Sequence, residues 1–291
     1  MTEVVGAAPR QAPLPGMPPR GYAASPSRLL AFLDCPRRYR MRYLDRPPPP
    51  ARAQRAHTTL GLAAHAALAR WWDLDAPDRT PSAGGRLVRE AWSGVGFRDA
   101  EQSARWRRVT EQHVTAYLVG VDPTRAPTGV ERSVAFAVDG LAVNGRVDRL
   151  DDRDGELVVV DYKTSRAVPT DEDARTSLPL ALYAAAVWRM WRRRCVRVEL
   201  HHLPTGAVAG HTHTPESLTR KLAEARSIAR DARDAEDDLV QRGPASTAFP
   251  AVVTPLCRWC DFRAACPEGQ AAGPEQPDWA ALEEPGGAGA R

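Results

Sequence analysis

The chain of 291 residues carries 40 basic and 36 acidic residues, so its formal net charge is only +4. This length allows a sizeable buried core, and no apolar run approaches the roughly 20 residues that a membrane-spanning helix needs. We therefore expect a folded protein without a membrane partner, and since no hydrophobic signal segment opens the chain, we expect it in the cytoplasm.

The two ends differ from the rest of the chain in composition. Residues 1–22 are rich in alanine and proline, and residues 268–291 are rich in glycine, proline and acidic residues, which predicts disordered tails. We expect residues 23–267 to form one domain. Its patterns predict, in chain order, a helix that begins at Ser25, a helix around His65, helical sequence over 86–119, three strands between Glu131 and Lys163, a helix over 179–192, a strand over 196–201 and a long helix over 215–239. Strands and helices mixed in this order indicate an α/β fold.

A predicted hairpin brings two carboxylates together. Asp154-Gly155 is a favoured type I′ turn of two residues, and counting outward from it places Asp148 directly opposite Asp161. Like charges at opposed positions destabilise a sheet. A divalent cation compensates them, because magnesium prefers carboxylate oxygens and retains waters. The alternative is a solvated acidic hairpin whose register differs by one or two residues.

Lys163 ends the second strand of this hairpin. Side chains alternate along a strand, so Lys163 shares the carboxylate face with Arg146, the residue opposite it. Of the 40 basic residues only Lys163 and Lys221 are lysines. A lysine is a compact point charge that changes its pKa more readily than an arginine. We therefore interpret Lys163 as a chemical group that positions or activates a water near the carboxylates.

The two strands resemble the RecB-like family of the PD-(D/E)XK nuclease superfamily. The similarity rests on residues 145–148, Gly-Arg-Val-Asp, and on residues 161–164, Asp-Tyr-Lys-Thr. It implies a nuclease core with a mixed central sheet flanked by helices. It also implies an enzyme that cuts DNA with magnesium or manganese.

The resemblance also assigns roles to single residues. The family has a metal-binding histidine on an upstream helix, which His65 matches, whereas a lone histidine on an apolar stripe is more often part of a core. His65, Asp148 and Asp161 would then hold the metal, with the backbone carbonyl of Tyr162 as a further ligand. Lys163 would be catalytic together with the two aspartates.

The match is partial at three further positions. Tyr183 matches a tyrosine on the family's next helix, but Pro179 stands where the family has a glutamine that contacts DNA or the active site. Glu131 opens the first strand, where the family often carries an acidic residue near the metal. We expect Tyr183, Glu131 and Arg146 to support the site, and packing or an exposed strand end are the alternatives for the first two.

Three cysteines, Cys257, Cys260 and Cys266, follow a C-x2-C-x5-C spacing. Intracellular cysteine clusters more often bind metal than form disulfides. Cys35 is a better fourth ligand than Cys195, which follows three arginines at the start of a predicted strand. Spacing alone allows zinc or an iron–sulfur cluster. The arrangement is similar to the staple of AddB-type nucleases, which implies a 4Fe-4S cluster joining the N- and C-terminal segments, with zinc as the alternative.

Arginines cluster beside aromatic residues in three segments. Arg37 and Arg38 belong to the first, next to Cys35, and other arginines flank Trp106 and Trp188. Phosphate neutralisation and base stacking hold single strands without reading their sequence. We expect the first cluster to border the path of the DNA, although each cluster alone also fits a solvated face.

Together these features predict a metal-dependent DNA exonuclease of the RecB type that acts in repair or recombination. The expected substrate is DNA with free ends or single-stranded DNA, and a helicase or repair protein is the expected partner. Exonuclease rather than endonuclease activity rests on the resemblance. The alternatives are a DNA- or helicase-binding module with a weakened nuclease site, and a nuclease of CRISPR adaptation or phage defence.

Overall fold

The computed structural model describes residues 22–51 and 54–282. The chain divides into two compact units, each assembled from separate stretches of sequence. Of the described residues, one unit comprises 22–51, 135–145 and 216–276, and the other comprises 54–134, 146–215 and 277–282. The segment 23–267, for which the sequence predicts one domain, therefore contributes to both units.

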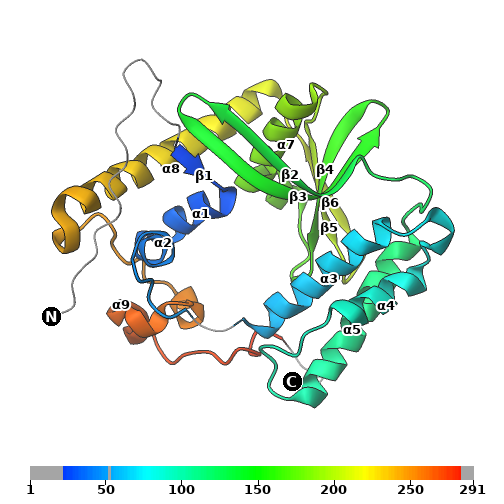
Figure 1. Ribbon diagram of the computed structural model, residues 1–291, viewed down its shortest axis with the longest axis horizontal. Coiled ribbons are helices and arrows are strands. Elements are labelled where there is room, and N and C mark those ends of the chain that lie inside the picture. Colours follow the sequence, from blue (N-terminus) through cyan, green and yellow to red (C-terminus); the bar gives the residue numbers. More distant parts are fainter. Residues whose placement is uncertain (1–21, 52–53, 283–291) are drawn as a thin grey trace. The chain divides into compact units, whose positions relative to one another are not determined.

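The strands form one mixed sheet in the order β1-β3-β4-β5-β6, with β2 paired to β3 (Figure 1). Their bounds are β1 Tyr22–Ala24, β2 Gly129–Val138, β3 Leu141–Arg153, β4 Glu156–Lys163, β5 Arg197–His202 and β6 Val208–Thr212. The pairs β3–β4 and β5–β6 are antiparallel, whereas β1–β3 and β4–β5 are parallel. The sheet confirms the predicted α/β class and the predicted succession of β2, β3 and β4.

Helices flank this sheet. Their bounds are α1 Pro26–Asp34, α2 Pro36–Tyr43, α3 Ala56–Trp72, α4 Pro81–Ala91, α5 Ala100–Val119, α6 Asp171–Thr176, α7 Leu178–Trp191, α8 Pro215–Arg242 and α9 Pro267–Ala271. Helices α3, α4 and α5 pack on one another, and α7 packs against β4 and β5 (Figure 1). None of the helices in the described ranges is long and apolar enough to cross a membrane.

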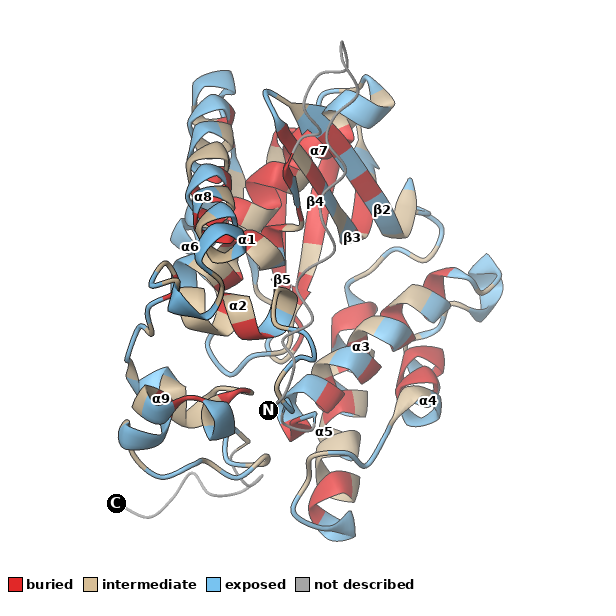
Figure 2. Ribbon diagram, turned by 60° about the vertical axis from the view of Figure 1, so that its left-hand side comes forward, coloured by how far each residue is buried: buried red, intermediate tan, exposed pale blue. Residues whose placement is uncertain are grey.

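The core of the unit that contains α3 to α7 lies between helices and sheet. Leu68 and Trp71 of α3 pack with Leu118 of α5 and with Val158 and Val160 of β4. Since alternate residues of a strand point to opposite faces, these two valines mark the face of β4 that α3 and α5 cover. Buried residues dominate β4 and α7 (Figure 2).

Side-chain caps account for several helix starts. The Arg28 N–H donates to Ser25 Oγ at 3.2 Å, which confirms the predicted start of α1. Ser177 caps α7 by accepting from the Leu180 N–H at 3.4 Å. Pro179 therefore lies in the first turn of α7, where its missing N–H costs no helical hydrogen bond.

The helical sequence predicted over 86–119 is wrong in one respect, because it forms two helices. The loop between α4 and α5 contains Gly96 with a φ of 86°, a conformation that residues with a side chain rarely adopt. Asp99 then starts α5, since its Oδ1 accepts from the Gln102 N–H at 2.7 Å.

Regular structure continues past residue 267, where the sequence predicts a tail. Helix α9 begins at Pro267, and the Ala56 N–H donates to the Asp278 carbonyl at 3.2 Å. Residues 1–21, nearly all of the predicted N-terminal tail, and residues 283–291, the last part of the predicted C-terminal tail, lie outside the described residues. The short elements β1, α6 and β6 were not predicted either, because three to six residues carry too little periodicity.

Candidate active site

The β3–β4 hairpin has the predicted register. Arg153 pairs with Glu156, and the pairing continues residue by residue to Arg149 and Val160. The next pair in this register is Asp148 and Asp161. Both turn residues have a positive φ, 53° and 91°, as a type I′ turn requires. The ladder of backbone bonds ends here because the Tyr162 N–H donates to Asp148 Oδ2 at 2.8 Å.

His65 on α3 reaches the same end of the hairpin. Its Nδ1 lies 3.4 Å from Asp148 Oδ1, and its Nε2 donates to the Tyr162 carbonyl at 3.1 Å. Gly61, one turn earlier on α3, permits this approach, because a Cβ there would lie only 3.3 Å from Thr164 Oγ1. The structure therefore brings together the histidine, the first aspartate and the carbonyl that the sequence singled out.

Glu131 joins this group from β2. Single ligand atoms of His65, Glu131 and Asp148 all lie within 4.8 Å of one another. Glu131 has a φ of 47°, a left-handed conformation that costs a residue with a side chain about 1–3 kcal/mol. Arg146 Nη1 lies 3.3 Å from its Oε2. Backbone strain at a residue that points to a ligand group is typical of functional positions.

Asp161 lies outside that group of three and pairs with Lys163. The Lys163 Nζ is 2.5 Å from Asp161 Oδ2, yet this buried oxygen has no hydrogen bond of normal geometry. Burial raises the pKa of Asp161, Asp148 raises it further, and Lys163 opposes both effects. Asp161 therefore keeps a desolvated oxygen that can accept a further donor or a cation.

The pKa of His65 is also shifted by burial and by neighbouring carboxylates. Burial disfavours its charged form, but Asp148 outweighs this and raises the pKa of His65 above its usual value, with smaller contributions from Asp161 and Glu131. A cationic partner is therefore stabilised at this position by three carboxylates.

Tyr183 of α7 faces the same carboxylates. Burial raises the pKa of its hydroxyl, and Asp161 and Asp148 raise it further, whereas a hydrogen bond with the Arg146 backbone lowers it. The predicted supporting residues Tyr183, Arg146 and Glu131 are thus all near the hairpin end.

The sequence profile of the PD-(D/E)XK nuclease superfamily matches residues 23–267. The chain belongs to this superfamily. Within the matched region, Asp148, Asp161 and Lys163 share one end of the β3–β4 strand pair.

Individual known proteins are more distant. The chain is 27% identical over 199 residues to the Gene 69 protein of Mycobacterium phage D29. The aligned region covers 68% of this chain and only 65% of the phage protein. The crystal structure of SSO0001 has 15% identity, a TM-score of 0.38 and coverage of 84% of this chain and 86% of the other. A putative exonuclease from Eubacterium rectale has 10% identity, a TM-score of 0.44 and coverage of 80% and 91%.

The four cysteines predicted as ligands line one cavity of about 20 Å³ in the unit that contains α8. Burial raises the pKa of Cys260, and Cys35 adds to the shift, so these two thiols are neighbours. Among the described residues no three cysteine sulfurs lie within 4.8 Å of one another, so the thiols share a cavity without forming a compact cluster. Cys195 is buried elsewhere, and burial raises its pKa to about 12.

The predicted DNA-bordering arginines lie next to this cavity and have intramolecular partners. Arg37 Nη1 is 3.4 Å from Glu268 Oε2, and Arg37 Nε donates to the Phe249 carbonyl at 3.0 Å. Arg38 Nη2 is 2.9 Å from Asp34 Oδ2. Both ion pairs are partly exposed, and such pairs contribute only about 0–1 kcal/mol, so a phosphate can compete for either arginine.

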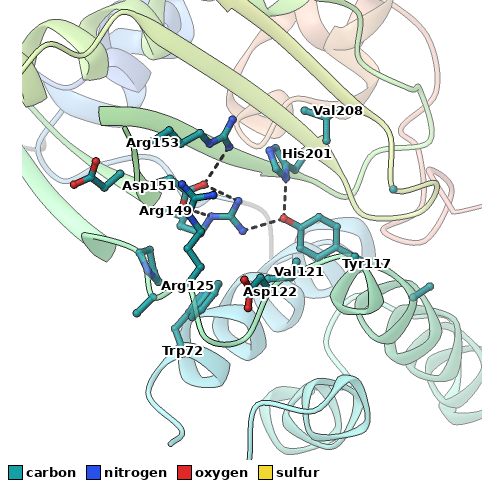
Figure 3. A pocket seen from close by; sticks show the side chains of 16 residues that line it. Trp72, Tyr117, Val121, Asp122, Arg125, Arg149, Asp151, Arg153, His201 and Val208 are labelled. Carbon is teal, nitrogen blue, oxygen red and sulfur yellow. Dashed lines mark hydrogen bonds and ion pairs between the residues drawn. The ribbon is translucent and has the colours of Figure 1, made fainter. Parts of the chain in front are cut away.

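A second cavity, of about 380 Å³, lies beside β3 and β5 and was not predicted from the sequence (Figure 3). Tyr117, Arg149, Arg153 and His201 line it and are joined by hydrogen bonds and ion pairs. The available signal was the alternation of charged residues at 149, 151 and 153, which places three charges on one strand face.

Proposed function

We propose that the chain is a magnesium- or manganese-dependent DNA exonuclease of the RecB type that acts in repair or recombination, with a helicase or repair protein as partner. The observation that carries the proposal is the convergence of His65, Asp148 and the Tyr162 carbonyl beside the Asp161–Lys163 pair. The RecB type and the exonuclease activity rest on the motifs of β3 and β4.

The residues present fit a hard divalent cation. Carboxylate and carbonyl oxygens are the preferred ligands of magnesium, and manganese also accepts imidazole. His65, Asp148, Asp161 and the Tyr162 carbonyl would hold the ion, and the approach of His65 to Asp148 and to the Tyr162 carbonyl supports this set. Glu131 is a further candidate ligand, since its strained backbone directs it to the same group. Such an ion lowers the pKa of bound water and stabilises charge on phosphate oxygens.

Hydrolysis needs a water in line with the scissile bond, and the protein supplies groups that orient it. Lys163 Nζ carries three N–H donors beside Asp161 and can hold the attacking water or a phosphate oxygen. Arg146 extends from the same face of β3 and, with Glu131 as its counter-ion, can bind a neighbouring phosphate. The water oxygen attacks phosphorus, the bond to the leaving sugar oxygen breaks, and a proton from water ends on that oxygen.

The test is cleavage of end-labelled linear and closed circular DNA, single- and double-stranded, with manganese or magnesium. We expect the wild type to degrade linear DNA and Lys163→Ala to lose at least 100-fold in rate, about the scale of one lost catalytic group. Wild-type protein that binds DNA without cutting it under any of these conditions contradicts the proposal.

A DNA- or helicase-binding module with a weakened nuclease site is the second candidate, and Pro179 favours it. Proline replaces the glutamine amide of the family at the start of α7. Pro179→Gln keeps the first-turn position, so we expect it to raise cleavage if the missing amide limits the enzyme. Equal rates for both proteins would remove this reason to prefer a binding module.

We also propose that Cys35, Cys257, Cys260 and Cys266 hold a 4Fe-4S cluster with a structural role. Support comes from their common cavity and from the Thr254 and Gly269 N–H groups, each 3.4 Å from a cysteine sulfur.

The cluster is tested on anaerobically purified protein. We expect visible absorbance with stoichiometric iron in the wild type, and colourless, poorly soluble protein for Cys257→Ser, because metal binding contributes to folding free energy. Cys195→Ser is the matched control and should keep its colour. Colourless wild-type protein with stoichiometric zinc would replace the iron–sulfur proposal with a zinc site.

A further inference from the structure

One buried charge has no part in the proposed chemistry. Arg149 follows Asp148 on β3, points to the opposite face of the strand and is only 5% exposed. Its Nη1 donates to the hydroxyls of Tyr117 and Tyr162, at 3.1 Å in each case. Its Nε and Nη2 contact the two oxygens of Asp151 at 2.9 and 3.1 Å (Figure 3). Hydrogen bonds therefore hold both terminal nitrogens, and Nε lies within ion-pair distance of Asp151.

Tyr162 connects this group to the candidate metal site. Its backbone N–H donates to Asp148 and its carbonyl accepts from His65, whereas its side chain lies on the Arg149 face. The ring is held edge-on by His65 and Tyr117, with centroids 5.8 Å apart in both pairs. The Tyr162 hydroxyl, ring and backbone are therefore each held by a contact, so a change at the hydroxyl can shift the backbone N–H and carbonyl that contact Asp148 and His65.

The hydrogen bonds beyond Arg149 run in one direction. The Tyr117 hydroxyl accepts from Arg149, so its own proton is free to donate to His201 Nδ1, 2.8 Å away. The Nε2–H of His201 then donates to Glu199 Oε2 at 3.0 Å. Glu199 accepts two further bonds from Arg153, each 2.8 Å long. Arg153 also contacts Asp151, which binds Arg149 as well, so the two arginines are linked through shared carboxylates and hydroxyls.

Metal ligands depend on such outer contacts, because groups that hydrogen-bond to a ligand fix its orientation and the affinity of the site. We propose that Arg149 is a positioning residue, which acts through the Tyr162 hydroxyl to hold the Tyr162 backbone, and with it Asp148 and His65, in the geometry that binds the divalent cation. This inference rests on the proposed function. It assigns a role in metal affinity to the face of the hairpin opposite Asp148 and Asp161.

Two tyrosines provide a matched test. Tyr162→Phe and Tyr117→Phe each remove one buried hydroxyl that accepts from the same nitrogen at the same distance, but only Tyr162 touches the ligands through its backbone. Mn²⁺ binding to the protein without DNA is measured from the electron paramagnetic resonance signal of free Mn²⁺, and melting is measured in parallel.

We expect Tyr162→Phe to weaken Mn²⁺ binding about tenfold and Tyr117→Phe to leave it within about twofold, with similar melting temperatures. Equal Mn²⁺ affinity in the two variants, or wild-type affinity in Tyr162→Phe, overturns the proposal. If Tyr162→Phe does not fold, Arg149→Lys is measured instead, because lysine keeps the charge without the fork that reaches both hydroxyls. Wild-type affinity in Arg149→Lys overturns the proposal equally.

The failure of the proposed function would look different. Wild-type protein that binds no Mn²⁺ refutes the metal site itself, whereas wild-type binding with unchanged variants refutes only the role of Arg149.

Discussion

Gly61→Ala should separate the stability of the fold from the activity of the site. In the interior of α3, alanine is favoured over glycine by about 0.8–1.0 kcal/mol, which in a domain of this size raises the melting temperature by about 2–4 °C. The added Cβ would lie 3.3 Å from Thr164 Oγ1, tighter than most real contacts, so α3 or the end of β4 must move by a few tenths of an ångström. His65 lies one turn further along the same helix face.

The loss of activity follows from that displacement. A misplacement of about 1 Å costs about 100-fold in rate, so a shift of about 0.3 Å costs about fourfold if the logarithm of the rate falls in proportion. The assay is the initial rate of DNA cleavage at saturating manganese, with thermal melting of the same preparations.

A double substitution supplies the control. Thr164→Ala removes the atom that the new Cβ would meet, so Gly61→Ala combined with Thr164→Ala should cleave at the rate of Thr164→Ala alone. A Gly61→Ala enzyme with the wild-type rate would refute the role of this close approach in placing His65. A double variant as slow as Gly61→Ala would refute Thr164 as its cause.

Three further substitutions probe other parts of the molecule. Gly84→Ala should lower the melting temperature, because the added Cβ would lie 2.2 Å from Leu118 Cδ1. Overpacking costs about 1–3 kcal/mol, which outweighs the gain in helix propensity. A higher melting temperature would contradict this packing. Glu199→Gln should cost about 1–3 kcal/mol in chemical denaturation, because it removes the negative charge that Arg153, Arg197 and His201 share. Burial opposes the charged form of Glu199, but His201 and Arg153 hold its pKa far below the usual range. The difference in the free energy of unfolding between variant and wild type should therefore stay constant down to about pH 5 and shrink only in stronger acid. A difference that is lost near neutral pH would refute the charged state of Glu199. Arg38→Ala should reduce the slope of log affinity against log salt for single-stranded DNA by about 0.7, and an unchanged slope would exclude it from the DNA path.

The hairpin could be predicted because its determinants are local. The turn dipeptide and the alternation of side chains fix which residues of β3 and β4 face each other, and the structure keeps that register from the turn to the site. His65 could not be found in this way, because a histidine on an apolar stripe has the same pattern whether it is core or ligand. Only the resemblance distinguished them.

Other features depend on contacts that no local pattern encodes. The φ of Glu131 is a property of the folded chain, so the sequence predicted an acidic residue near the metal but not its strained backbone. Tyr117 and His201 are 84 residues apart, and their hydrogen bond exists only because α5 packs against the sheet beside β5. Asp161 was predicted as a metal ligand and pairs with Lys163 in this structure, two residues along the same strand face.

The type I′ turn and the glycine of α3 adjust the site in different ways. The turn lies six residues from Asp148, about 20 Å along the strand at about 3.3 Å per residue, yet it decides which carboxylates meet. A strand can change its register only by whole residues, and a single step turns each side chain to the opposite face. The strand-borne acids are therefore either paired correctly or not at all. The helix that carries His65 can slide by tenths of an ångström, so the position of the histidine can change gradually, whereas the pairing of the hairpin acids can change only in whole steps.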